Sequence, residues 1–270
     1  MLNILKIAGL AYGALLLGAV LFEKKLLFKN KALPPDYPYV FEQKFEERWY
    51  EPTAGVRLNA LYFRTDSVPR RGVVLYCHGN ADNLARWGKY APDFTQRGYD
   101  VLMFDYRQFG KSTGKITSEA VLHRDTRFIY EQLKRDVPED SLVLYGRSLG
   151  TGLATKLAAE TNPRLLLLET PYYNLAAVGW SHFPLLPYSL LGRFTLRTDQ
   201  WITRVRCPIH LFHGTHDGLV PYSHSLRLAE KLGRNPAEIL TTIPGGGHKN
   251  LSTFPAYQAA LDSCLRWSVR

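Results

Sequence analysis

The sequence has little cysteine, no internal repeat and no low-complexity tract. Its three cysteines, Cys77, Cys207 and Cys264, lack both the paired spacing of a zinc site and the density of a disulfide framework. We therefore expect buried, reduced thiols and no metal site. With 46% hydrophobic and 21% charged residues, the composition excludes a disordered chain and a polytopic membrane protein.

Acidic residues are also in deficit, with 24 Asp and Glu against 34 Lys and Arg, a formal net charge of +10. Such a balance is compatible with nucleic-acid binding, but the basic residues are scattered and no recognised nucleic-acid motif is present. We therefore expect no nucleic-acid partner. Attraction to anionic membrane lipid is the better explanation for the excess charge. The length of 270 residues suffices for one large α/β domain.

Long hydrophobic runs are scarce, and the only candidate for a membrane segment is the uncharged stretch 7–22. It is short for a bilayer core of about 30 Å, but flanking leucines and lysines extend it. No small residues follow the run, so it makes a poor cleaved signal peptide. We predict that residues 1–32 form a single-span membrane anchor with a basic flank. The lysines after the run slightly favour a cytoplasmic catalytic domain over residues 33–270.

The remainder of the chain alternates between strand and helix patterns. Two strand-like stretches, 40–50 and 56–64, predict an antiparallel pair at a sheet edge. The apolar run 72–77 is typical of a strand buried on both faces. Further strands are expected at 100–104, 141–145, 165–168, 208–212 and 239–243, with helices between them. The fold class is therefore α/β, a mostly parallel sheet with helices on both faces.

One region interrupts this alternation, at about residues 170–205. It is rich in aromatic residues and leucine, and a long insertion of this kind is more often functional than passive. We predict a short helical cap whose inner face forms an apolar substrate pocket. The candidate pocket residues are Tyr172, Tyr173, Trp180 and Phe183.

The residues Gly146-Arg147-Ser148-Leu149-Gly150 follow a predicted strand and precede a predicted helix. A G-x-S-x-G in this context indicates a nucleophile elbow, in which the sharp turn exposes the serine hydroxyl and requires glycine on both sides. Ser148 is the candidate nucleophile. The sequence alone assigns no role to Arg147.

The candidate base is chosen from eight histidines. His248 follows the last predicted strand, in a loop with three glycines that lets an imidazole lie over the carboxyl edge of the sheet. Six of the others are expected to be structural strand residues (His78, His210 and His213), helix-surface residues (His123 and His224) or part of the cap (His182).

The candidate acid is Asp217, in the turn that follows the predicted strand 208–212. From that edge its carboxylate can accept the Nδ1 proton of His248. Glu169, at the end of an earlier strand, is the alternative, and Asp105 precedes the elbow in the chain. The order serine, acid, histidine along the chain favours Asp217.

An oxyanion hole needs N–H groups directed at the developing negative charge. One candidate is the backbone N–H of Leu149, at the start of the helix after the nucleophile. The second is expected in the loop 78–81, either from the side chain of Asn80 or from its backbone N–H.

The segments HGNADN (78–83), DYRQFGKSTG (105–114), GRSLGTG (146–152), HGTHDGLVP (213–221) and GGGHKN (245–250) together resemble the α/β-hydrolase superfamily. They are most similar to its Bem46-like, ABHD13/ABHD17-like branch. The resemblance implies an α/β-hydrolase fold with Ser148 as nucleophile, Asp217 as acid, His248 as base and oxyanion donors near Asn80 and Leu149. The cysteine-rich N-terminus of the depalmitoylating members is absent, so that activity is not implied.

These observations predict a membrane-anchored serine hydrolase of carboxylic esters or thioesters. The substrate is expected to be a small or lipid-like acyl compound, with no metal or organic cofactor. A serine aminopeptidase-like peptidase uses the same groups, but the predicted cap contains only one acid, Asp199, to bind a free amine. A non-enzymatic membrane scaffold on the same fold is the remaining alternative.

Overall fold

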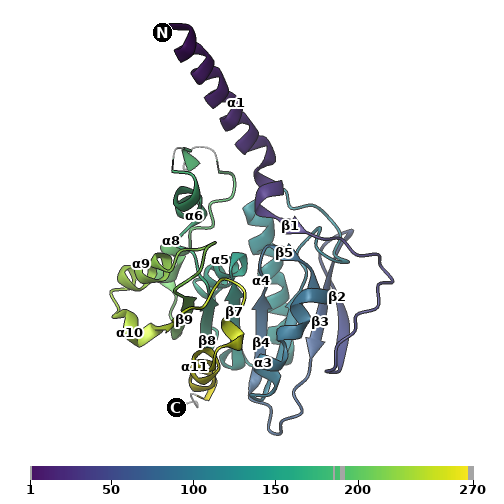
Figure 1. Cartoon of the computed structure of the whole chain (residues 1–270). Coiled ribbons are helices and arrows are strands. Elements are labelled where there is room, and N and C mark those ends of the chain that lie inside the picture. Colours follow the sequence, from purple (N-terminus) through teal and green to yellow (C-terminus); the bar gives the residue numbers. More distant parts are fainter. Residues whose placement is uncertain (1, 185, 189–191, 267–270) are drawn as a thin grey trace.

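The computed structural model describes residues 2–184, 186–188 and 192–266 (Figure 1). Its centre is an eight-stranded sheet with the order β10-β9-β8-β7-β4-β6-β3-β2. A separate two-stranded sheet joins β1 and β5. The strands are β1 (Lys29–Asn30), β2 (Phe45–Thr53), β3 (Val56–Phe63), β4 (Gly72–Cys77), β5 (Ala81–Asp82), β6 (Tyr99–Phe104), β7 (Leu142–Arg147), β8 (Leu165–Glu169), β9 (Ile209–Gly214) and β10 (Leu240–Ile243).

The main sheet is parallel from β10 to β6, and β3 and β2 extend it as antiparallel strands. The central strands β4, β6, β7 and β8 are buried at every residue, which explains their continuous apolar sequences. Because parallel strands end at the same edge, the residues after Cys77, Arg147, Glu169, Gly214 and Ile243 meet there.

Helices connect the parallel strands and cover both faces of the sheet. The regular helices are α1 (Leu2–Leu27), α2 (Leu84–Trp87), α3 (Pro92–Thr95), α4 (Glu119–Asp136), α5 (Leu149–Ala158), α6 (Leu175–His182), α8 (Thr198–Trp201), α9 (Ser223–Lys231), α10 (Pro236–Ile239) and α11 (Pro255–Arg266). Short 3₁₀ turns are η1 (Gly88–Tyr90), η2 (Glu139–Ser141), η3 (Ile202–Arg204) and η4 (Leu251–Thr253).

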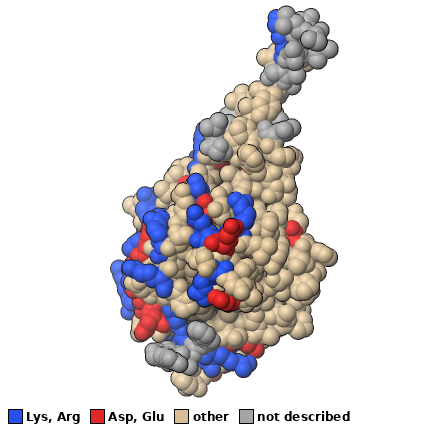
Figure 2. All heavy atoms as spheres, turned by 90° about the vertical axis from the view of Figure 1, so that its left-hand side faces the viewer, with Lys and Arg blue, Asp and Glu red and all other residues tan. Residues whose placement is uncertain are grey.

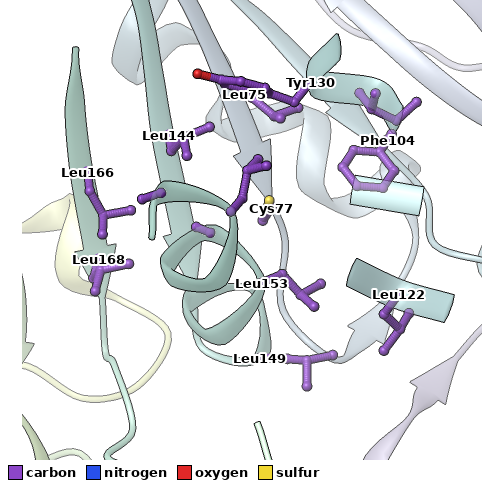
Figure 3. Close-up of a cluster of buried hydrophobic side chains, with 14 of the residues drawn as sticks. Leu75, Cys77, Phe104, Leu122, Tyr130, Leu144, Leu149, Leu153, Leu166 and Leu168 are labelled. Carbon is purple, nitrogen blue, oxygen red and sulfur yellow. The ribbon is translucent and has the colours of Figure 1, made fainter. Parts of the chain in front are cut away.

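Alternation along the strands divides the core into two layers. One layer packs strand residues such as Leu75 and Cys77 against α4, α5, α8 and α9. The other packs Val74 and Tyr76 against α2, α3 and α11. Figure 3 shows Leu153 of α5 beside Cys77, so the helix that follows the elbow is seated on the strand next to it. Burial on both sides holds the sheet edge, and the loops that leave it, in fixed positions.

Helix α1 projects from the body of the molecule (Figure 1). It covers the stretch for which the sequence predicts a membrane anchor. Among the residues that the structure describes, no helix combines the length and hydropathy needed to cross a bilayer. The predicted single-span anchor is therefore not supported.

The insertion between β8 and β9 contains α6, α8 and η3.

Figure 2 shows the side of the molecule on the left of Figure 1, where basic side chains are spread over the surface with acidic ones among them. This mixture agrees with the scattered basic residues of the sequence and does not form a patch of one sign on this face.

Three predictions from the sequence need correction. The strand expected at residues 40–50 begins only at Phe45, because the preceding aromatic residues pack as loop residues on the second core layer. His224 lies on α9 but is buried rather than on its surface, and its Nδ1 accepts the backbone N–H of Tyr173. All three cysteines are free, as expected, but Cys207 and Cys264 are only half-buried.

Candidate active site

Ser148 stands in a strained turn between β7 and α5. Its φ of 51° and ψ of −118° are unfavourable for a residue with a side chain. A Cβ on Gly146 would lie 2.6 Å from the carbonyl oxygen of Gly150, and one on Gly150 would collide with the carbonyl of Cys77. The backbone segments around Ser148 therefore approach so closely that only glycine fits at positions 146 and 150. This is the geometry that the G-x-S-x-G pattern predicts for a nucleophile elbow.

The loops after β9 and β10 bring two further side chains to this turn. Nε2 of His248 lies 2.9 Å from the Oγ of Ser148, and Nδ1 of His248 lies 2.8 Å from Oδ2 of Asp217. All three residues follow the carboxyl ends of parallel strands. The structure thus joins the predicted nucleophile, base and acid in one hydrogen-bonded chain, while their catalytic roles remain predictions.

Asp217 is held as a carboxylate. Its other oxygen accepts the backbone N–H groups of Leu219 and Val220 at 2.9 and 2.8 Å, and His213 Nε2 lies 3.3 Å from Oδ2. Burial by itself raises the pKa of Asp217, but hydrogen bonds from His213 and His248 outweigh burial and lower that pKa well below its usual range. An ionised Asp217 keeps the proton of His248 on Nδ1, so Nε2 is left to accept the Ser148 proton.

Glu169, the alternative acid, has other partners. Its Oε1 lies 3.0 Å from Nε of Arg147, and its Oε2 accepts the hydroxyl of Tyr145. Arg147 and Glu169 are 3% and 1% exposed, so the ion pair is enclosed by protein. Glu169 is therefore engaged beneath the elbow rather than with His248.

Arg147 also reaches the loop that carries the candidate base. Its Nη2 donates to the carbonyl oxygen of Lys249 at 3.0 Å, and its guanidinium lies 4.4 Å from the ring centre of Tyr90. Burial opposes the charge of Arg147, but the nearby Glu169 raises the pKa of Arg147 well above its ordinary value. The sequence did not predict the contact between Arg147 and the loop that carries His248. The only signal in the sequence was the position of Arg147 next to Ser148.

The hydrogen bond to Lys249 leads to a test of Arg147. Arg147→Lys keeps a positive charge near Glu169 but loses the planar fork that also reaches the Lys249 carbonyl. We expect kcat for ester hydrolysis to fall about tenfold or more, while Arg147→Met destabilises the fold by about 3–5 kcal/mol because it leaves Glu169 buried without its partner. Steady-state kinetics and urea denaturation measure the two effects.

Arg97→Lys is the matched control, because Arg97 pairs with Asp262 and carbonyls of α3 and α11 rather than with the base loop. It should lower stability without lowering kcat. Equal losses of kcat in Arg97→Lys and Arg147→Lys would show that the Lys249 contact has no special importance.

The two predicted oxyanion donors lie in the segments expected. Leu149 is the first residue of α5, where backbone N–H groups have no partner within the helix. The loop after β4 adjoins the elbow, since a Cβ built on Gly79 would lie 3.7 Å from the Cβ of Ser148. The side chain of Asn80 points elsewhere and donates to the carbonyl of Leu27 at 2.9 Å. Of the two alternatives for Asn80, this arrangement favours the backbone N–H.

The four predicted pocket residues have different environments. Tyr172 is buried in the core and its hydroxyl donates to the carbonyl of Leu149. Tyr173 lines a cavity of about 330 Å³ together with Arg227, Glu230 and Lys231. Trp180 and Phe183 are 56% and 66% exposed. The structure does not bring these residues together, because Tyr172 and Tyr173 pack on the core whereas Trp180 and Phe183 are exposed at the end of α6 and just after it.

Other titratable residues near the sheet edge have structural partners. Nε2 of His78 lies 3.3 Å from Oδ1 of Asp105, and both side chains are fully buried. The other Asp105 oxygen accepts the N–H of Leu84, so Asp105 supports the loop after β4. Within the described part of the chain, no group of three or more His, Cys, Asp or Glu residues is arranged to hold a metal ion.

Known proteins resemble this chain in sequence and in structure. A family profile described as serine aminopeptidase, S33, matches residues 68–195. An uncharacterized protein of Mycobacterium tuberculosis is 33% identical over 202 residues, which cover 74% of this chain and 71% of that protein. The alpha/beta hydrolase domain-containing protein aho-3 of Caenorhabditis elegans is 29% identical over 71% of this chain and 57% of its own length. The chain belongs to the α/β-hydrolase superfamily.

Two further comparisons concern hydrolases with named activities. The lysophosphatidylserine lipase ABHD12 of Danio rerio is 30% identical over 58% of this α/β hydrolase, but the match spans only 46% of that lipase. The esterase Pf2001 of Pyrococcus furiosus superposes with a TM-score of 0.67 at 22% identity, covering 87% of this chain and 98% of the esterase. The latter likeness shows the fold alone.

The predicted superfamily and fold class are thereby confirmed: this α/β hydrolase has a mostly parallel sheet covered by helices on both faces. One of its sequence relatives is named as a lipase, and a protein named as an esterase shares its fold. The assignment to the Bem46-like, ABHD13/ABHD17-like branch stays a prediction.

Proposed function

We propose that this protein is a serine hydrolase that cleaves carboxylic ester or thioester bonds of apolar acyl substrates. The observation that supports this most directly is the hydrogen-bonded chain from Asp217 through His248 to Ser148. A serine hydroxyl is a weak nucleophile by itself, and an adjacent imidazole oriented by a carboxylate activates it.

In the proposed reaction, Ser148 Oγ attacks the acyl carbonyl while its proton passes to Nε2 of His248. Asp217 stabilises the imidazolium through Nδ1. The negative oxygen of the tetrahedral intermediate lies against the N–H groups of Leu149 and the loop after β4. Collapse of the intermediate expels the alcohol or thiol, which takes the proton from Nε2, and an acyl group remains on Ser148.

Deacylation repeats the same steps with water. His248 removes a proton from water as it attacks the acyl-enzyme, and then returns that proton to Ser148 Oγ as the carboxylic acid leaves. All the groups required are side chains or backbone N–H groups of this chain.

The substrate class is inferred from the relatives and from the residues around the cap. Relatives named as a lipase and an esterase support an ester of an apolar or lipid-like acyl chain. The exposed Trp180 and Phe183 supply apolar surface for such a chain on the outer part of α6.

The family profile is described as a serine aminopeptidase, which makes peptide hydrolysis the second candidate. An aminopeptidase needs a carboxylate free to bind the substrate amine. Asp199, the one acid of the insertion, is 4% exposed and forms an ion pair of 2.8 Å with Arg197. A buried and paired carboxylate is poorly placed for this purpose, so the ester reading is preferred.

Chemical labelling and a substrate panel test the proposal. A fluorophosphonate should modify the full-length protein at Ser148, as identified by peptide mass spectrometry. Among p-nitrophenyl esters from acetyl to dodecanoyl, kcat/KM should rise with chain length, because each buried methylene contributes about 0.8 kcal/mol. A lysophospholipid and an acyl thioester should also be cleaved.

Aminoacyl p-nitroanilides provide the comparison that decides between the two candidates. The proposal expects little or no release of nitroaniline from them. Faster cleavage of these amides than of any ester would establish the peptidase instead, and absence of covalent labelling would refute both.

A further inference from the structure

The end of α1 and the segment that follows it contact a loop beside the proposed nucleophile. We define the N-terminal strap as residues 23–33, which run from the last turn of α1 through β1. It contacts the oxyanion loop at residues 78–83, and the residues that form the hydrogen bonds are more than fifty positions apart in the chain. Because β1 and β5 form a two-stranded sheet, this sheet joins the strap to the oxyanion loop.

The oxyanion loop lies directly against the proposed nucleophile. A Cβ built on Gly79 would lie 3.7 Å from the Ser148 Cβ, an ordinary van der Waals distance, so Gly79 adjoins the nucleophile. A Cβ on Gly150 would meet the carbonyl of His78 at 2.8 Å, so the elbow packs onto the beginning of this loop. A small displacement of the loop therefore moves its N–H groups relative to Ser148.

The strap binds the next residue of the loop on two sides. The side chain of Asn80 donates to the carbonyl of Leu27, and the carbonyl of Asn80 accepts the N–H of Lys29 at 2.8 Å. Leu27 is the last residue of α1, where carbonyl groups have no partner within the helix. The hydrogen bond thus satisfies the helix end and at the same time fixes the orientation of Asn80.

The strap also supports two strained positions in the loops beside the nucleophile. Asp82 and Gln108 have φ values of 62° and 67°, which are unfavourable for residues other than glycine. The carbonyl of Asp82 accepts the N–H of Lys31 at 3.3 Å, and that of Gln108 accepts Nδ2 of Asn30 at 2.6 Å. Strained conformations persist only where surrounding contacts enforce them. Here the strap supplies such contacts to both loops.

A buried aromatic ring anchors the strap to the body. Phe28 is 6% exposed and packs edge-on against Phe109 and Phe194, with ring centres 6.4 and 5.1 Å away. Just before it, Oε1 of Glu23 accepts the N–H groups of Arg193 and Phe194 at 2.7 and 3.1 Å. The strap therefore connects the end of the insertion with the oxyanion loop.

We propose that the N-terminal strap holds the oxyanion loop in its productive position, which makes Asn80 and Phe28 positioning residues for hydrolysis. This inference rests on the proposed function. The strap touches no reacting atom, and its contribution lies in keeping the N–H groups of the loop directed at the developing oxyanion, where a shift of about 1 Å costs up to roughly 100-fold in rate.

Two substitutions in the full chain test the proposal. Asn80→Ala removes the contact with Leu27 and keeps the backbone N–H, whereas Phe28→Ala loosens the strap without touching the loop. For each we expect kcat to fall about 10- to 100-fold per fluorophosphonate-titrated site, with KM changed less than about threefold. Hydrogen–deuterium exchange of the peptide 78–84 should become faster in both.

Matched variants separate positioning from loss of stability. Asn235→Ala makes the same change of residue at the start of α10, where the Asn235 side chain accepts the backbone N–H of Ala237, and it should lower stability with kcat unchanged. Phe28→Leu keeps an apolar side chain in the same site and should restore most of the rate lost in Phe28→Ala. A merely structural strap would lower stability in Asn80→Ala and Phe28→Ala and leave kcat per titrated site unchanged.

The outcomes distinguish this inference from the proposed function. An active wild type with unchanged kcat in Phe28→Ala refutes the strap alone, even if exchange of the peptide 78–84 is faster. A lower kcat only in Asn80→Ala also refutes it, because the Asn80 side chain would then act by itself. A wild type that neither cleaves esters nor labels at Ser148 refutes the proposed function, and with it the catalytic importance of the strap.

Discussion

Ser148→Ala is expected to reduce kcat for p-nitrophenyl esters by roughly 10⁵- to 10⁶-fold, which is the usual cost of removing a serine nucleophile. In the proposed mechanism the acyl group is transferred to the Ser148 hydroxyl, which lies beside His248 Nε2. No acyl-enzyme can form without this hydroxyl. Alanine is smaller than serine and needs no different backbone, so the strained turn at φ 51° is preserved. Steady-state kinetics and fluorophosphonate labelling measure the loss.

Ser263→Ala is the control for this experiment, because it removes an exposed serine hydroxyl from α11, a helix that carries none of the proposed catalytic groups. It should match the wild type in kcat and in melting temperature. Ser148→Ala should match the wild type in melting temperature only. If it kept more than about one hundredth of the activity, Ser148 would not be the nucleophile.

Asp217→Asn is expected to lower kcat about 10⁴-fold with little change in fold. The amide removes the charge that stabilises the imidazolium, and its NH₂ group facing Nδ1 favours the tautomer with the proton on Nε2. That tautomer cannot accept the proton of Ser148. The measurement is kcat/KM for a p-nitrophenyl ester, with circular dichroism to establish that the variant is folded.

Glu169→Gln is the matched comparison, since it makes the same change of carboxylate to amide on the neighbouring strand. Glu169 pairs with Arg147, so this variant should lower stability and reduce kcat by about tenfold at most, through the Arg147 contact with Lys249. A larger loss of kcat from Glu169→Gln than from Asp217→Asn would assign the acid to Glu169.

The order of the elements and the candidate site are largely predictable from the sequence. Strands buried on both faces have continuous apolar sequences, and the glycines around Ser148 reflect a local turn that no larger residue allows. Asp217 and His248 follow successive strands, and parallel strands end at one edge. The proximity of these residues to Ser148 therefore follows from local patterns and one rule of topology.

Predictions that required a distance between remote segments were less successful. Trp180 and Phe183 face outward although they were expected to line a pocket with Tyr172. The position of His224 in its helix predicted a surface residue, but residues of the insertion between β8 and β9 cover its side chain. Periodicity describes which face of an element is apolar, and it contains no information on which other segment packs there.

By itself, the sequence determined the α/β class, the glycine-flanked turn at Ser148 and the loops that carry Asp217 and His248, because these depend on residues that are neighbours along the chain. Only the tertiary structure decided that Glu169 pairs with Arg147, that Arg147 reaches Lys249, and that the strap at residues 23–33 supports the oxyanion loop. Each of these contacts joins segments of different strands or loops. Their partners are selected by the three-dimensional packing of the sheet, which no local pattern specifies.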